Sequence, residues 1–223
     1  MMTNLFSIFD PSTPSFLSMN WLSCLLFSLL IPSTMWMNNS RYNFLASSMF
    51  HYIFSEFKPL VKTMPFMLIL PLSFFVSILY NNVMGLLPYV FTATSHLSFT
   101  LSLALPCWIT TLIFGWLNNT NNILAHLIPQ GTPPLLMPFM VLIEMVSNII
   151  RPGTLAIRLT ANMIAGHLLI VLLSSSFLVL PFMSSPILLV SQVALSTLEI
   201  AVAFIQAYVF SVLITLYLSE CST

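Results

Sequence analysis

The chain has 223 residues, of which 58% are hydrophobic and only 4% are charged, with five basic and five acidic side chains. About a quarter of the residues of a soluble globular protein are charged, so this composition excludes a soluble domain and indicates a polytopic membrane protein. A net charge of zero also excludes the basic surface of a nucleic-acid-binding protein. The three cysteines are far apart and lack metal-ligand spacing, so neither a metal site nor a disulfide framework is expected.

The first part of the chain is expected to contain one membrane span and one interfacial helix. A span needs about 20 mostly apolar residues, and the first such stretch covers about 16–36. The segment 38–62 is polar and aromatic, with Phe50, Phe54 and Phe57 near one helical face, which predicts an amphipathic helix at the membrane surface. Three of the five basic residues lie here, so the positive-inside rule places this loop on the cytoplasmic-equivalent side.

Four further apolar segments follow. Those at 64–87 and 97–117 are expected to form a helical hairpin, and two longer ones cover 135–176 and 187–218. Even a 30-residue helix would reach about 45 Å, so the last two are expected to form a hairpin of long helices that tilt strongly or bend. Pro152, followed by a glycine, offers a kink in the first of them.

The predicted fold class is therefore an all-α polytopic membrane protein, with about five membrane helices plus an interfacial amphipathic helix. The chain, 1–223, is expected to form a single integral membrane domain. Five crossings, counted from the basic loop, place the N-terminus outside and the C-terminus inside.

Arg158 is the only fixed charge in the apolar run 154–173. An arginine at the centre of a bilayer costs roughly 2.5–3.5 kcal/mol on insertion scales, and its guanidinium does not escape that cost by losing its proton. Asn162 lies four residues on and shares the arginine's helical face. His167 lies nine residues on, about half a turn round, and faces away.

The last apolar segment carries a polar stripe, because Gln192, Glu199 and Gln206 are spaced by seven, with Ser196 on the same side. Glutamate and histidine gain and release protons, while amides and hydroxyls orient or pass them on. The clustering of such groups on the last two segments therefore indicates a proton path. The preceding segment adds Glu144, Asn148 and Arg151.

Simpler interpretations of the same residues stay open. An intramembrane asparagine or glutamine can serve only as an interhelical hydrogen bond. Glu199 can be a structural ion-pair partner of Arg158, and His167 can be a core histidine with no transport role. Glu144 and Arg151 can simply mark membrane interfaces.

Several stretches resemble subunit a of the mitochondrial rotary ATP synthase. They are RLTANMIAGHLL at 158–169, LEIAVAFIQAYVFSVLITLYL at 198–218, HLIPQGTPPLLMPFMVLIEMVS at 126–147 and NNVMGLLPYVFTATSHLS at 81–98. The opening SIFDPST, 7–13, resembles animal and in particular arthropod-like members. The resemblance covers nearly the whole chain, and the first two motifs are highly specific.

The resemblance implies roles for individual residues. Arg158 would face the essential carboxylate of a rotating ring of c subunits and separate two aqueous half-channels. His167 and Glu199 would line the half-channel that takes up protons from the intermembrane space, and Glu144 would lie on the release side, towards the matrix. The polar positions near the arginine would be Asn162 and Gln206, with Gln192, Ser196 and Asn148 as further members of the path.

The resemblance thus implies a proton-conducting stator subunit in the mitochondrial inner membrane, with its N-terminus in the intermembrane space and its C-terminus in the matrix. Its partners would be the c ring, the peripheral stalk, other stator subunits and the lipid bilayer, with no nucleic acid and no cofactor. The subunit would not be an enzyme by itself, and the chain has no phosphate-binding glycine-rich loop. The alternative is a stand-alone proton or ion channel, or a secondary transporter, which would favour internal repeats and two interrupted helices.

Overall fold

A computed structural model of the protein describes residues 5–12, 19–25, 28, 31, 38, 40–61, 65–118, 120–128, 133–177 and 185–222. No β-strand occurs among these residues, and four of the helices they form are long and apolar enough to cross a bilayer. The prediction of an all-α polytopic membrane protein is confirmed. Much of the expected span 16–36 lies outside the described residues, and its longest described part is the short 3₁₀ helix η2, Met19–Leu25.

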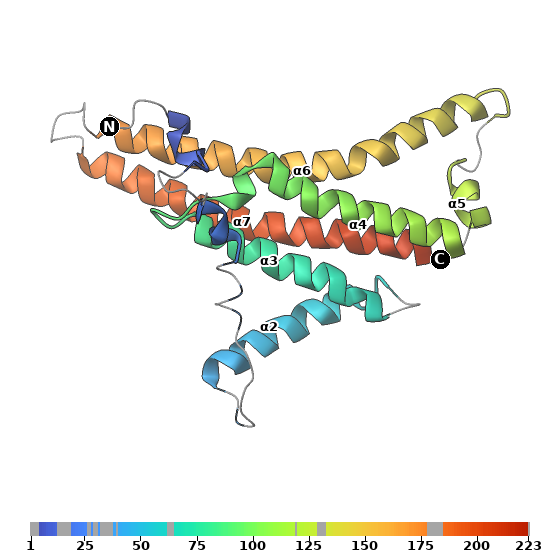
Figure 1. Cartoon of the computed structure of the whole chain (residues 1–223), viewed down its shortest axis with the longest axis horizontal. Coiled ribbons are helices and arrows are strands. Elements are labelled where there is room, and N and C mark those ends of the chain that lie inside the picture. The colour runs from blue at the N-terminus through green and yellow to red at the C-terminus, as the bar shows by residue number, and fades with distance from the viewer. Residues whose placement is uncertain are drawn as a thin grey trace. The chain divides into compact units, whose positions relative to one another are not determined.

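Figure 1 shows the helices in chain order, coloured from blue to red. After the 3₁₀ helix η1, Leu5–Phe9, and η2 come α2, Arg41–Phe57; η3, Pro65–Leu68; α3, Ile69–Gly85; η4, Ala93–Ser95; α4, Leu97–Asn118; and α5, Thr120–His126. The last two are α6, Met137–Ser176, and α7, Ser185–Ser222. They have 40 and 38 residues, roughly 60 Å each at 1.5 Å per residue. Their tilt in a bilayer stays a prediction.

Local sequence explains where α2 begins and how other helices accommodate polar side chains and proline. The Ser40 side chain caps α2 by accepting a hydrogen bond from the Asn43 N–H at 3.2 Å. Pro106 and Pro152 lie inside α4 and α6, where each removes one backbone hydrogen bond. Serine and threonine hydroxyls in the apolar helices donate to carbonyls three residues back, as Thr197 does to Ala194 at 2.8 Å. These side chains thereby satisfy their polarity within their own helix, as a lipid environment requires.

The chain divides into two compact units, each of which takes parts of the long helices. Unit 1 is Met1–Ser33, Phe75–Thr100 and Arg158–Val209. Unit 2 is Thr34–Phe74, Leu101–Ile157 and Phe210–Thr223.

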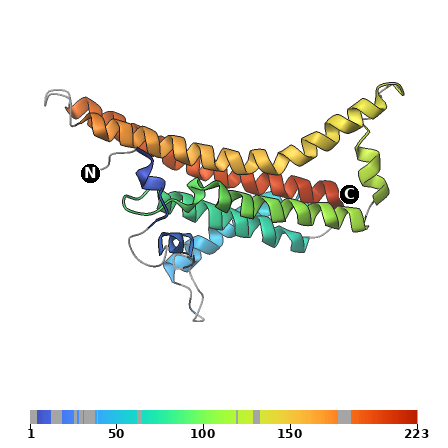
Figure 2. The same cartoon turned by 45° about the horizontal axis from the view of Figure 1, so that its top comes forward.

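Within unit 1, the second part of α6 and the first part of α7 lie side by side in both views (Figure 1, Figure 2). Ala203 and Ala207 of α7 are almost completely buried in this unit, and small side chains let helices approach closely. Beside these helices, η2 packs against η4, with the Trp21 ring 5.3 Å from the His96 ring, centroid to centroid. The polar side chains of Asn82 and Thr94 are also fully buried in this unit.

Unit 2 has an apolar core contributed by several helices. Phe57 of α2 is 1% exposed, and Phe74 of α3 meets Phe210 of α7 with ring centroids 6.0 Å apart. The first turns of α6 diverge from the end of α7 (Figure 2). Pro152 is buried in α6, and an interior proline is a common cause of a helix bend.

Candidate functional site

Glu199 is a buried carboxylate on α7 that packs directly against α6. Its side chain is 8% exposed, and neither carboxylate oxygen has a hydrogen-bond partner among the described residues. The absence of a side chain at Gly166 creates the space, because a Cβ built there would lie 2.9 Å from Oε1 and 3.0 Å from Cδ of Glu199. A buried polar group without a hydrogen-bond partner is uncommon in folded proteins and calls for an explanation.

His167 follows Gly166 on α6 and is half-buried. Its Nε2 atom is buried and has no hydrogen-bond partner among the residues that the structure describes. The imidazole stands edge-on to the ring of Phe9, with centroids 6.2 Å apart and an interplanar angle of 81°. The imidazole and the Glu199 carboxylate are therefore two titratable groups on adjacent helices.

Two open cavities in unit 1 meet at His167. The first, which we call the Glu199 cavity, has a volume of about 570 Å³. Its polar lining residues are Asn162, His167, Ser191 and Glu199. The second, the Gln192 cavity, measures about 780 Å³ and is lined by the loop 85–92 together with His167, Gln192 and Ser196. His167 lines both, so it stands at the junction between a cavity that contains the carboxylate and a larger one bordered by the loop.

Arg158 lines neither cavity. It is exposed, as are Ala161, Asn162 and Ala165, and no described residue forms an ion pair with it. The ion pair with Glu199 that the sequence left open is therefore not formed. Exposed apolar side chains occur on both helices in this unit, at Leu169, Leu172, Val190, Val193, Leu198 and Ile205.

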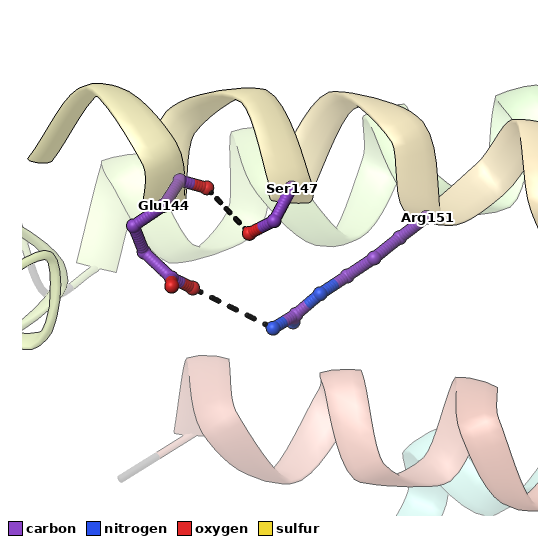
Figure 3. A network of polar contacts seen from close by, with 3 residues as sticks. All are labelled: Glu144, Ser147 and Arg151. Atoms are coloured by element: carbon purple, nitrogen blue, oxygen red, sulfur yellow. Dashed lines mark hydrogen bonds and ion pairs between the residues drawn. The ribbon is translucent and has the colours of Figure 1, made fainter. Parts of the chain in front are cut away.

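A second polar cluster lies in unit 2. Glu144 and Arg151 of α6 form an ion pair, with 3.5 Å between Oε1 and Nη2 (Figure 3). The Ser147 hydroxyl donates to the backbone carbonyl of Glu144 at 2.8 Å, and the guanidinium carbon of Arg151 lies 5.5 Å from the centroid of the Tyr217 ring. Sequence reasoning left Arg151 without a role. The spacing of seven from Glu144, which places two long side chains on nearly the same helical face, could have identified the pair.

The other residues of the predicted proton path do not form a single cluster. Asn148 and Gln206 are half-buried and line neither of the unit 1 cavities. The expected stripe on α7 has Glu199 buried and Gln192 half-buried, and these two residues line different cavities. Among the described residues, no group of three or more histidine, cysteine or acidic side chains could hold a metal ion.

The fold and the site together define a class: a polytopic α-helical membrane protein whose ionisable side chains line cavities within its long apolar helices. Comparison with known proteins narrows the class. The family model described as "ATP synthase A chain" matches residues 16–219. The chain is 55% identical to ATP synthase subunit a of Drosophila simulans over 227 residues, and 55% identical to that of Locusta migratoria over 223. It is 51% identical to the Aedes aegypti protein over 234 residues, and each alignment covers 99% of both chains. The chain belongs to the ATP synthase subunit a family, as its motifs predicted.

Proposed function

We propose that the chain is the proton-conducting stator subunit of the ATP synthase membrane sector in the mitochondrial inner membrane. Two offset half-channels would carry protons to and from the carboxylates of a c ring, with Arg158 between them. The subunit would couple the protonmotive force to ring rotation without catalysing ATP chemistry. The observation that best supports this proposal is that the titratable side chains and the arginine of unit 1 have different surroundings. His167 and Glu199 line a shared cavity, whereas Arg158, nine residues before His167 on the same helix, is exposed and lines neither cavity.

The uptake half-channel would run through the two cavities of unit 1. A proton from the intermembrane space would pass from the Gln192 cavity to His167, which borders both cavities. It would then reach Glu199, whose carboxylate oxygens have no described hydrogen-bond partner and are therefore available to bind it. Gln192, Ser196 and Asn162 would orient water along this route, because amides and hydroxyls both donate and accept hydrogen bonds.

The exposed surface of α6 and α7 in unit 1 would face the c ring. Apolar side chains of this surface, such as Leu198 at 62% exposure, suit contact with another membrane helix or with lipid. Arg158 would attract a deprotonated ring carboxylate, because Coulomb attraction is strong where the dielectric constant is low. A guanidinium cannot relay a proton, so the same residue would block a direct leak between the half-channels.

The release half-channel would use Glu144, with Asn148 nearby in the sequence. A ring carboxylate that reaches Arg158 after nearly a full turn would lose its proton towards Glu144 and the matrix. The protonmotive force sets the direction, since each charge moved across 100 mV supplies about 2.3 kcal/mol.

The N-terminus would lie in the intermembrane space and the C-terminus in the matrix, with the peripheral stalk and other stator subunits as further partners. Proton flux through liposomes that contain this chain, with and without a c ring, tests the proposal against a stand-alone channel or transporter. Flux that requires the ring, and that stops when ring rotation is blocked, supports the stator role. Flux through the chain without any ring would contradict it.

A further inference from the structure

Arg151 is the one basic residue of α6 that the proposed proton path does not use. It stands seven residues after Glu144, which is about 10.5 Å along a helix axis. The two side chains nevertheless converge, so that Nη2 lies 3.5 Å from Oε1, and both extend along the same side of α6 (Figure 3). The side chains are 34% and 38% exposed, so the pair is partly shielded from surrounding solvent or lipid.

Arg151 also contacts a residue of α7. Its guanidinium carbon lies 5.5 Å from the centroid of the Tyr217 ring, within the range of a cation–π contact. Tyr217 is itself packed, because it lines a small apolar void of about 10 Å³ together with Ala104, Cys107 and Trp108 of α4. The guanidinium therefore lies between a carboxylate on its own helix and an aromatic ring that α4 supports.

We propose that Arg151 is the positioning residue of the release side: it holds the Glu144 carboxylate in the orientation in which Glu144 accepts protons. This inference rests on the proposed release role of Glu144. Arg151 is suited to the task because it stays protonated and so does not accept the proton itself. Contact with Tyr217 would restrict the movement of the guanidinium and so the direction in which its planar fork meets the carboxylate.

Few other groups compete for the carboxylate. Among the described residues, the ion pair that the structure forms for Glu144 is the one with Arg151. One titratable side chain that contacts that arginine is Tyr217. The α4 side chains that line the void beside Tyr217 contribute the Cys107 thiol but no carboxylate or base.

A double-mutant cycle on the complete ATP synthase, reconstituted in liposomes, tests the proposal. Arg151→Gln should lower ATP synthesis driven by an imposed pH gradient and membrane potential by about two- to fivefold, the effect of losing a partly exposed ion pair. In a Glu144→Gln background the same change should have no further effect, because the arginine acts through the carboxylate. Arg151→Lys, which keeps the charge but not the planar fork, should restore part of the rate. Arg41→Gln, which removes an exposed arginine of α2, is the matched control and should leave the rate unchanged.

An unchanged rate in Arg151→Gln, or losses that multiply in the double variant, would overturn the positioning role while leaving the proposed function intact. Failure of the proposed function would be seen separately, as full ATP synthesis in Glu144→Gln and in Arg158→Lys. If Arg151→Gln does not assemble, Arg151→Lys takes its place in the cycle, and its smaller loss should also disappear in the Glu144→Gln background.

Discussion

The carboxylate of Glu199 lies where a side chain at position 166 would be, because a Cβ on Gly166 would approach Oε1 to 2.9 Å. Helix α6 thus accommodates the buried acid of α7 by lacking a side chain at that position. Glycine destabilises a helix by roughly 0.5–1 kcal/mol relative to alanine. Here it also leaves room for the carboxylate. In the proposed mechanism, that space is where the carboxylate takes up its proton.

Gly166→Ala should therefore displace the Glu199 carboxylate without preventing assembly, since the clashing atoms are the mobile end of a side chain. A misplacement of about 1 Å can cost up to about 10²-fold in a reaction that depends on geometry, and we expect proton-driven ATP synthesis to fall at least severalfold. The matched control is Gly153→Ala on the same helix, where a built Cβ meets nothing within 4 Å. Equal activity of the two variants at equal assembly would show that the contact does not matter.

Glu199→Gln should abolish most proton uptake while preserving the shape of the buried side chain. An amide has the volume of the acid but cannot carry the proton, and loss of a group that transfers protons typically costs 10²–10⁴-fold. ATP synthesis at a fixed imposed protonmotive force provides the measurement. Glu199→Asp keeps a carboxylate that is one methylene shorter and should retain intermediate activity. A Glu199→Gln enzyme as fast as the unmodified one would exclude Glu199 from the path.

Ser196 and Thr197 are adjacent hydroxyl residues of α7 with different surroundings. Ser196 lines the Gln192 cavity, whereas Thr197 is exposed and lines neither of the two cavities. If that cavity carries water, Ser196→Cys should react faster with a charged thiol reagent than Thr197→Cys. The comparison uses the complete enzyme with its native cysteines replaced, and modification at Ser196→Cys should also slow ATP synthesis. Faster reaction at Thr197→Cys would place the water on the other side of α7.

Periodicity predicted much of the fold and part of the site. The nine-residue spacing from Arg158 to His167 predicted that the two residues face apart, and the structure has Arg158 exposed and the Nε2 atom of His167 buried. Long apolar runs likewise predicted the long helices α6 and α7. Both predictions depend only on the geometry of a single helix.

Contacts between helices could not be predicted from periodicity. Periodicity does not give the register of one helix against another, so the contact between Glu199 and Gly166 could not be derived from it. Arg151 was left unassigned because neighbours on a helix are usually sought at three or four residues, whereas two long side chains span seven here. The expected span 16–36 stays a prediction, because much of it lies outside the described residues.

The central claim is that Arg158 acts as a fixed charge that cannot carry a proton. ATP synthesis driven by an imposed protonmotive force in the complete enzyme with Arg158→Lys tests this claim most directly. Lysine keeps the positive charge, but it can shed its proton near an apolar surface and lacks the planar fork. We predict an assembled enzyme that makes no ATP under this force, while Arg41→Lys on α2 retains full activity. Normal proton-driven ATP synthesis by the Arg158→Lys enzyme would contradict the mechanism.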